Sequence, residues 1–392
     1  MSEPTSQPSV SAGERLRAQA AVITVVAVYG ITNGLITPVL TLNLERDGIS
    51  AQVIGLIVAI SAAGTLFVSP YVPKLMARFG TVTVIGASLA VEAVAMLLLP
   101  IFTGVVAWAV IRFVMGVSLA CLYIASEVWI TELTEQRHRA RVLAVYNAVM
   151  SVSIGLGPLI IVGTGTQGWA PFLAAEAIVI GAAVLLPFAA RYALRAAEHS
   201  DVAMLGIIRE APSLILGTLT VAIIFGSAIG LLPVYGVRAG FSEDAAALMV
   251  TAVMVGGVVL QFPLGWLADR LPRYGVLFGC GLASVCSIPI VPFVLDAPIT
   301  LNALLFIWGG VSTAIYTVAM AIGGDRFKGP KLAMLMAAFG VMWGIGAMVG
   351  PLLGGWAMRV WDPHGLIAVF VFLPSLWLLF ALVRHWNRLV KA

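Results

Sequence analysis

Charged residues are scarce in this sequence. Asp, Glu, Lys and Arg together make up 10% of the 392 residues, and the types A, V, I, L, M, F, W, Y and C make up 61%. A soluble domain carries about 25% charged residues, because its exterior faces water. The composition therefore excludes a cytosolic enzyme, a secreted disulfide scaffold and a disordered chain. It indicates a membrane protein with several spans of roughly 20 apolar residues each.

Cysteines and enzyme motifs are also rare. Cys121, Cys280 and Cys286 lie inside apolar runs, at spacings that fit neither a metal site nor a disulfide framework. The sequence has no G-x-x-x-x-G-K-S/T run and no H-E-x-x-H run, which mark ATP binding and zinc hydrolases. We therefore expect no metal, no cofactor and no enzyme activity, with the proton gradient as the energy source. The net charge of +4 is typical of a cytoplasmic membrane face and does not indicate a nucleic-acid partner.

Charged residues and Pro or Gly divide the chain into twelve apolar runs, each long enough for a transmembrane helix. Strands of a membrane barrel would alternate polar and apolar residues, and these runs do not. We therefore predict an all-α membrane protein with twelve transmembrane helices. The predicted spans are 19–43, 50–71, 82–101, 104–128, 140–163, 170–190, 212–236, 244–267, 275–295, 299–321, 331–357 and 365–384.

The loop charges predict the orientation. Most of the 22 Lys and Arg residues fall in the loops on one side, whereas Arg46, Arg238 and Arg359 fall in the opposite loops. The positive-inside rule then places both termini in the cytoplasm. The longest loop predicts a division into a six-helix bundle at 1–190, a cytoplasmic linker at 191–211 and a second six-helix bundle at 212–392.

The two halves repeat one another at offsets of 192 to 196 positions. Any single match is weak, but several matches in the same order indicate a duplicated bundle. The clearest pairs are Gly30 with Gly226, Gly116 with Gly309, Tyr123 with Tyr316, and Gly157-Pro158 with Gly350-Pro351. Two pseudo-symmetric bundles predict a substrate site near the bilayer midplane, between the halves.

Several short motifs carry a family resemblance. They are the loop run 265–273 (GWLADRLPR), its weaker first-half copy at 73–80 (PKLMARFG), the run 112–116 (RFVMG) in the fourth span, and the glycine–proline runs 155–158 (GLGP) and 346–355 (GAMVGPLLGG). Over essentially its whole length the chain resembles the major facilitator superfamily of secondary transporters. Glu127-Val-Trp129, followed by basic Arg137, Arg139 and Arg141, resembles an uncharacterised bacterial branch of the efflux type.

The ionisable residues inside predicted spans include Glu92, Arg112, Glu127 and Glu176. Such residues are costly in hydrocarbon and are candidates for function. Arg112 lies roughly 14 Å below the outer end of its span, at the depth of Glu92, so the two can pair if their faces match. Glu127 is about 22 Å further along the same helix, where a partly desolvated carboxyl group is a candidate proton carrier. We expect Arg112, Glu127 and Glu92 to serve proton coupling or substrate binding, and Glu176 to be structural.

The loop motifs predict an intracellular gate. In the resembled family, the motif Arg pairs with an acid at the end of the fourth or tenth span. This implies the pairs Arg78–Glu132 and Arg270–Asp325, with Asp269 facing the start of the fifth span. The first-half motif has Ala77 where the family has Asp, so the second-half gate is expected to be the stronger.

Uncharged candidates for the cavity lining follow from the spans that line the pathway in the family. They are Asn33, Thr37, Tyr123, Asn147, Gln261, Trp308, Ser312, Tyr316 and Trp343. Together they predict an aromatic, lightly polar cavity. In spans five and eleven, Gly157, Pro158, Gly350 and Pro351 predict helix bends, because proline removes a hydrogen bond and glycine permits close approach.

The leading functional prediction is a proton-coupled antiporter that works by alternating access and exports a small amphiphilic organic compound. It would act as a monomer in a bacterial inner membrane, with the substrate and the lipid bilayer as partners. Three alternatives remain open. They are proton-coupled import of an organic anion bound at Arg112, movement of a lipid or lysolipid, and a transporter-like receptor that moves nothing.

Overall fold

A computed structural model describes residues 12–134, 138–190 and 205–389. These residues form a succession of α-helices with two short 3₁₀ turns. The helices are α1 (Ala12–Arg46), α2 (Ala51–Val68), α3 (Val72–Phe79), α4 (Thr81–Ile101), α5 (Val105–Leu133), α6 (Arg139–Thr164), α7 (Ala170–Ala190), α8 (Leu205–Glu210), α9 (Pro212–Arg238), α10 (Glu243–Arg270), α11 (Arg273–Ser287), α12 (Pro298–Arg326), α13 (Pro330–Val360) and α14 (Gly365–Leu389), with η1 (Ser69–Tyr71) and η2 (Ile288–Phe293).

Every predicted apolar run coincides with a helix, because a chain in hydrocarbon must satisfy its backbone hydrogen bonds internally. In the described residues, eleven helices are long and apolar enough to cross a membrane. The remaining prediction, 170–190, coincides with α7, which is an apolar helix over Ala170–Val184. The ninth span is interrupted: α11 ends at Ser287 and continues as η2, where Pro289 and Pro292 remove backbone donors.

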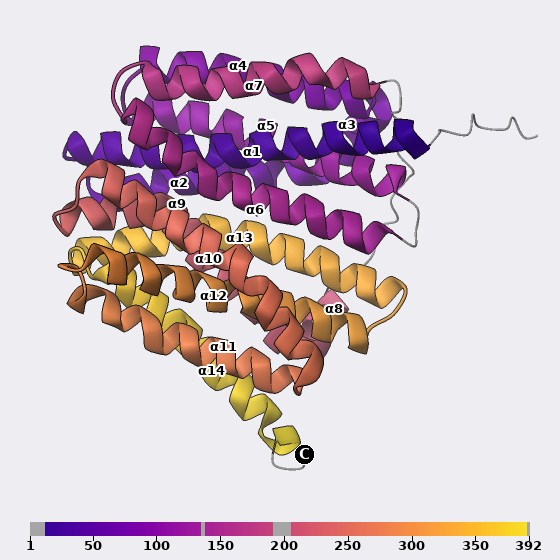
Figure 1. Cartoon of the computed structure of the whole chain (residues 1–392), viewed down its shortest axis with the longest axis vertical. Helices are drawn as coiled ribbons and strands as arrows, with labels where there is room; N and C mark the ends of the chain where they lie inside the picture. Colours follow the sequence, from indigo (N-terminus) through magenta and orange to yellow (C-terminus); the bar gives the residue numbers. More distant parts are fainter. Residues whose placement is uncertain (1–11, 135–137, 191–204, 390–392) are drawn as a thin grey trace, which may run out of the picture.

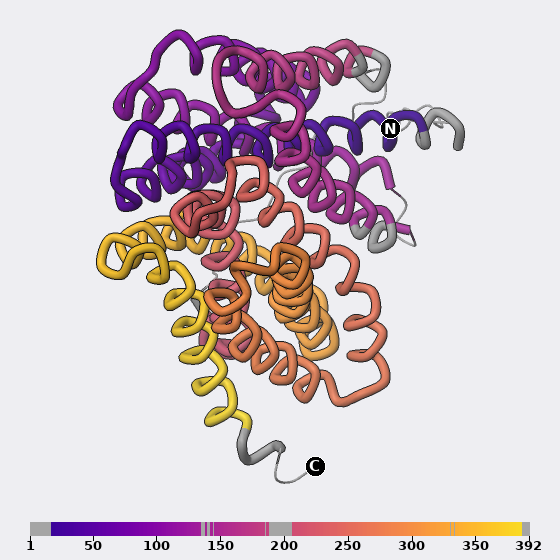
Figure 2. The backbone as a smooth tube through the Cα atoms, turned by 60° about the vertical axis from the view of Figure 1, so that its left-hand side comes forward, coloured from indigo at the N-terminus to yellow at the C-terminus, as the bar shows by residue number. Residues whose placement is uncertain are grey.

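The helices lie in two layers, with α1–α7 in one and α9–α14 in the other (Figures 1 and 2). Between the layers, α2 packs against α13 and α6 packs against α10. The domain boundaries remain a prediction, because residues 191–204 of the linker lie outside the described residues. The end of the linker is α8, whose Glu210 accepts hydrogen bonds of 2.9 and 3.0 Å from Lys331 on α13.

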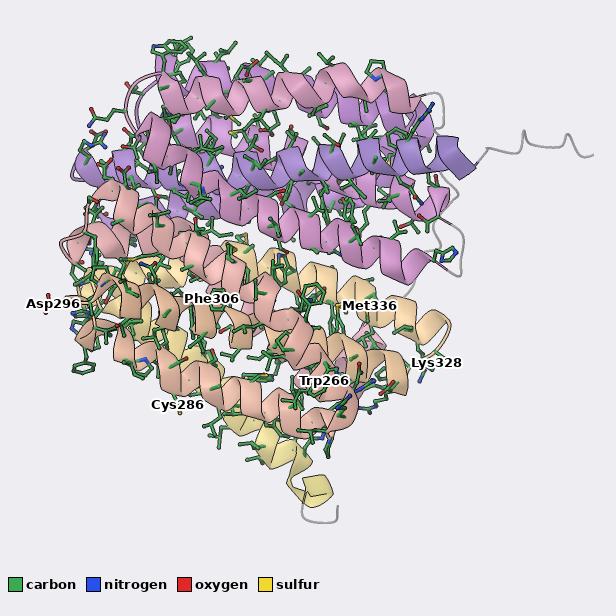
Figure 3. The ribbon with its side chains drawn as sticks, in the orientation of Figure 1. Trp266, Cys286, Asp296, Phe306, Lys328 and Met336 are labelled. Carbon is green, nitrogen blue, oxygen red and sulfur yellow. The ribbon has the colours of Figure 1, made fainter. Side chains whose placement is uncertain are left out.

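Asp296 and Lys328 mark opposite ends of the helices (Figure 3). Following the charge-based orientation, we name the end that carries Asp296 the outer end and the end that carries Lys328 the inner end. Which end faces the cytoplasm remains a prediction.

The halves share a core at the outer end only. Buried apolar residues of the described chain form three clusters, and the largest joins the outer parts of both halves, from Leu35 and Ile54 to Leu231 and Val250. At the inner end each half has a cluster of its own. The molecule is therefore packed shut at its outer end and divided between two separate cores at its inner end.

The glycine–proline motifs that were predicted to bend the helices lie inside continuous helices. Their glycines pack closely against a neighbouring helix. A methyl group on Gly157 would overlap the backbone of α1 at Gly34, and one on Gly350 would overlap the backbone of α9 at Ile223. Pro158 and Pro351 follow these glycines within α6 and α13. The repeated motif thus fixes the same helix contact once in each half.

Candidate functional site

Three tyrosines of the first half form what we call the first aromatic cluster: Tyr29 on α1, Tyr123 on α5 and Tyr146 on α6. The ring centroids of Tyr29 and Tyr123 are 5.7 Å apart, and those of Tyr123 and Tyr146 are 6.1 Å apart. The Tyr146 hydroxyl is buried and shares a 2.7 Å hydrogen bond with Ser126. Tyr29 and Tyr123 are only half-buried, so part of each side chain remains open to the space beside it.

Glu127 lies one helical turn from Tyr123, toward the inner end of α5. Its side chain is half-buried, and its carboxylate makes no hydrogen bond or ion pair with any described residue. It is close enough to interact electrostatically with Tyr123 and Tyr146 of its own half and with Tyr316 of the other half. A partly desolvated, unpaired carboxylate between the two halves can accept a proton or a cationic group.

The second half carries an equivalent group, which we call the second aromatic cluster: Phe225, Tyr316, Phe339 and Trp343. The Tyr316 ring is 5.3 Å from Trp343 and 6.0 Å from Phe339, and Phe225 is 5.8 Å from Trp343. Tyr123 and Tyr316 are close enough to interact electrostatically, so the two clusters come near one another at the boundary between the halves.

Tyr123, Tyr316 and Trp343 were predicted from the sequence, whereas the other aromatic residues of the two clusters were not. The repeat offers a signal for them. Tyr146 and Phe339 lie 193 positions apart, as Tyr123 and Tyr316 do, and Tyr29 and Phe225 lie 196 apart, as Gly30 and Gly226 do.

Glu92 and Arg112 belong to a second polar group, which we call the buried ion cluster: Thr37, Glu92, Arg112 and Ser118. Arg112 donates a 3.2 Å hydrogen bond to Thr37, and Ser118 donates a 2.8 Å hydrogen bond to Glu92. Glu92 is 1% exposed and Arg112 is 3% exposed. Among the described groups, Glu92 Oε2 and Arg112 Nη1 have no hydrogen-bond partner.

The two charges of this cluster act on one another and on Tyr29 electrostatically, without a direct ion pair in the described structure. Tyr29 therefore belongs to the first aromatic cluster and also interacts electrostatically with the buried ion cluster. Glu176 on α7 is 9% exposed and lies outside both groups.

Several predicted lining residues lie elsewhere. Trp308 and Ser312 are fully buried inside the second half, where Trp308 packs on Phe370 at 4.8 Å and Ser312 bonds to Ser284 at 2.8 Å. Their placement on the pathway was wrong. They face the neighbouring helices α14 and α11 instead.

The amide candidates differ in exposure. Asn147 on α6 is exposed, and Asn33 is half-buried and accepts a 3.2 Å hydrogen bond from Thr37, which is itself buried. Gln261 donates a 2.9 Å hydrogen bond to Thr317 within the second half. Of these three, Asn147 has the most exposed side chain.

The inner gate differs from the prediction in its arginine. Asp325 pairs with Arg273, which also lies 3.3 Å from Asp269, whereas Arg270 stacks on Trp266 with 3.9 Å to the ring centroid. The predicted Arg270–Asp325 pair is therefore wrong, because α10 ends at Arg270 and the chain turns before Arg273 begins α11.

The first-half gate is less fully described. Arg78 lies over the ring of Phe79 at 5.2 Å. The pairing of Arg78 with Glu132 remains a prediction, as does the contact of Asp269 with the start of α6, where residues 135–137 lie outside the described residues.

Charged residues join the halves at the outer end, in what we call the outer latch: Glu45, Arg46, Arg238 and Glu243. Arg238 on α9 binds the carboxylate of Glu45 on α1 through two hydrogen bonds of 2.8 Å. Arg46 pairs with Glu243 on α10. From the sequence, Arg46 and Arg238 were assigned only to loops, since their pairing depends on the contact between the halves.

Backbone contacts complete the outer seal. A methyl group on Gly55 of α2 would overlap the carbonyl oxygen of Pro351, and one on Gly355 of α13 would overlap that of Ala51. Arg359 also donates a 2.6 Å hydrogen bond to Gln52 across the same contact. The site near Glu127 is thus closed from the outer end.

In the described residues, no group of three or more His, Cys, Asp or Glu side chains is placed to hold a metal ion. The arrangement near Glu127 offers one carboxylate, several rings and several hydroxyl groups. It suits reversible binding of a small molecule or a proton between the two halves.

Comparisons with known proteins agree with this architecture. The sequence profile of the Major Facilitator Superfamily matches residues 22–246 and 214–389. Among solved structures, the chain is similar to the nucleoside transporter NupG in a mutant form, with a TM-score of 0.74, 8% identity, and coverage of 94% of this chain and 98% of that one. A bacterial homolog of the human lysosomal transporter Spinster, inward-facing and unoccupied, matches with a TM-score of 0.69, 15% identity and 95% coverage of both chains.

Sequence relatives point the same way. An uncharacterized MFS-type transporter of Bacillus subtilis (strain 168), YfkF, is 24% identical over 381 residues, covering 93% of this chain and 95% of the relative. The MFS-type transporter Ent638_1421 of Enterobacter sp. (strain 638) is 25% identical over 350 residues, covering 86% and 88%. Since the family's profile matches residues 22–246 and 214–389, this chain belongs to the Major Facilitator Superfamily and is a multi-pass membrane transporter, not an enzyme.

Proposed function

We propose that this protein is a proton-coupled antiporter that exports a small amphiphilic organic compound across a bacterial inner membrane, acting as a monomer. The observation that carries the proposal is the unpaired, half-buried carboxylate of Glu127, which interacts with tyrosines of both halves. A group in that position exchanges protons with whichever side the site faces. It also loses the proton most readily when a substrate competes for the same space.

Alternating access follows from the packing. The halves share a core and the outer latch at one end, and have separate cores at the other. Rocking the halves would break the outer latch and bring the inner cores together, so that Glu127 turns from one side of the membrane to the other. In the exporting cycle, substrate enters from the inner end and displaces the proton, and a proton from outside later displaces the substrate.

Proteoliposomes loaded with a pH-sensitive dye test this proposal. They are challenged with a panel of cationic, neutral and anionic amphiphiles, and we expect proton movement opposite to that of at least one compound. Glu127→Gln should remove proton-driven transport and retain downhill exchange of the compound. Glu176→Gln is the matched control, because it neutralises a carboxyl group outside both aromatic clusters and should behave as wild type.

Proton movement that persists in Glu127→Gln would refute the role of this carboxylate. No proton movement with any compound, from a protein whose melting curve shows that it is folded, would refute the antiport proposal.

A second candidate is proton-coupled import of an organic anion. It is favoured by one observation, the unpartnered Nη1 of Arg112. Against it, Arg112 is almost fully buried and Glu92 acts on it as a nearby negative charge. If Arg112 binds the anion, Arg112→Gln abolishes anion binding while Glu127→Gln still binds. The antiport proposal instead expects Glu127→Gln to lose proton-driven transport and to keep downhill exchange.

A further inference from the structure

Among the described residues, Glu127 is the charged residue that acts electrostatically on both aromatic clusters. The electrostatic neighbours of Tyr123, Tyr146 and Tyr316 are Glu127 and other tyrosines, and no described Lys or Arg acts on them. Arg112 acts on Tyr29, but Glu92 acts on the same ring with the opposite sign. The space between the clusters is therefore negative when Glu127 is ionised.

The rings around Glu127 have the chemistry that recognises cations. The face of an aromatic ring is negative, and it attracts ammonium groups placed within about 6 Å of its centroid. Tyr123 and Tyr316 are tilted against their neighbours rather than stacked flat, at 37° to Tyr29 and 59° to Trp343. The clusters thus present a carboxylate together with rings from both halves.

Free hydrogen-bonding groups also remain at the site. The hydroxyls of Tyr29, Tyr123 and Tyr316 make no hydrogen bond to any described residue, and their side chains are half-buried. These oxygens can accept a hydrogen bond from a protonated amine. An organic anion would instead meet the Glu127 carboxylate, with no described basic side chain to balance it.

At the position equivalent to Glu127, the second half carries an uncharged residue. Glu127 and Met320 lie 193 positions apart, and each follows a tyrosine of the repeat by four residues. Met320 is 37% exposed, and its thioether makes favourable contacts with aromatic groups. The carboxylate that would bind a charged group therefore comes from the first half, whereas the second half contributes apolar side chains at the equivalent position.

From this arrangement we propose that the substrate is a lipophilic monovalent organic cation, such as an aromatic amine. Its charged group would lie between Glu127 and the rings of Tyr123 and Tyr316, and its apolar body against Trp343 and Phe225. The proposal rests on the proposed function for the direction of transport only, because binding can be measured at equilibrium without a proton gradient.

Two probes of nearly the same size and opposite charge test the proposal: tetraphenylphosphonium and tetraphenylborate. Binding of each to the purified full-length chain is measured by equilibrium dialysis, with detergent alone as the blank. We expect tetraphenylphosphonium to bind at least about tenfold more tightly, the ratio that corresponds to ~1.4 kcal/mol. Equal affinity for the two probes, or tighter binding of tetraphenylborate, would overturn the proposal.

Variants assign the charge preference to named residues. Glu127→Gln should weaken tetraphenylphosphonium binding about tenfold or more, and Tyr316→Leu should weaken it about 3- to 30-fold. Glu176→Gln is the matched control and should bind as wild type. Should Glu127→Gln fail to fold, Glu127→Asp keeps the charge. It should retain the cation preference, and losing that preference while folded would count against the assignment.

The outcome separates this proposal from the proposed function. Cation binding without proton movement in proteoliposomes would refute antiport and leave the cation site standing. Proton antiport of a neutral compound, with no preference between the two probes, would refute the cation site and leave antiport standing.

Discussion

Removing the carboxylate of Glu45 tests whether the outer latch holds the outer end shut. The Glu45→Gln substitution keeps the shape of the side chain and removes one of the two acids that pair with Arg238. The pair is bidentate, with both distances 2.8 Å, and the side chains of Arg238 and Glu45 are 18% and 14% exposed. Asp362 remains as a second partner at 2.8 Å.

The expected magnitude lies between two reference cases. An exposed ion pair contributes about 0–1 kcal/mol, and breaking a fully buried one costs about 3–5 kcal/mol. With this geometry and low exposure, we expect Glu45→Gln to destabilise the closed outer end by about 2 kcal/mol. For a molecule with two states, that corresponds to a shift of roughly 30-fold toward the state open at the outer end.

Cysteine labelling measures this shift. Val58 on α2 is 9% exposed and lies against α9, where a methyl group on Gly230 would approach its side chain to 2.7 Å. Val58→Cys, in a chain whose three native cysteines are replaced by alanine, should react with a membrane-impermeant maleimide only when the outer end opens. Adding Glu45→Gln should raise the labelling rate up to about 30-fold.

The matched control is Asp47→Asn. Asp47 immediately follows Arg46, is exposed, and forms no ion pair with any described residue. The Asp47→Asn substitution removes one negative charge from the same surface and leaves the ion pairs of the outer latch intact. If Glu45→Gln labels no faster than Asp47→Asn, the latch does not hold the closed state, and the reasoning from its geometry is refuted.

Two further predictions concern packing and the inner gate. Gly157→Ala should destabilise the protein by about 1–3 kcal/mol, because its methyl group would meet the backbone of α1. Gly163→Ala is the control, since its methyl group meets no atom within 4 Å. Equal melting temperatures of the two variants in detergent would contradict the close packing of Gly157 against α1. Arg273→Ala should destabilise it by at most about 1 kcal/mol, since Asp325 is 64% exposed, and Arg270→Ala by less. A melting temperature lowered more by Arg270→Ala would show that the gate assignment is wrong.

The fold was predictable because composition leaves few alternatives. Apolar runs of this length must form helices, and the repeat of Gly157-Pro158 as Gly350-Pro351 predicts two equivalent bundles. The site was predictable in part for a similar reason. Ionisable residues such as Glu127 and Arg112 stand out in apolar spans, because a charged side chain in hydrocarbon costs free energy and is therefore a candidate for function.

The errors arise where tertiary packing decides. Trp308, Ser312 and Tyr316 follow one another at four-residue steps, which suggests a common face. Each step of four residues turns the helix by about 40° beyond a full turn, so Trp308 and Tyr316 differ by about 80°. Trp308 consequently points into its own bundle and Tyr316 toward the other half.

Ring clusters and loop arginines depend on the fold in the same way. Tyr29 and Tyr146 come from helices far apart in the sequence, and only the packing of α1 and α6 on α5 brings them to Tyr123. At the inner gate, the turn between α10 and α11 decides whether Arg270 or Arg273 reaches Asp325, and residue spacing does not specify that turn.

The single carboxylate at the two aromatic clusters has an electrical consequence. A site that holds either one proton or one monovalent cation is neutral in both cases, so each half of an exchange cycle carries the same charge across the bilayer. The membrane potential, worth about 2.3 kcal/mol per charge at 100 mV, then does no work on the exchange. A pH difference of about one unit, equivalent to 1.36 kcal/mol, would sustain up to about a tenfold concentration ratio of substrate. Such a transporter would continue to export in a cell whose membrane potential has collapsed, as long as the pH difference remains.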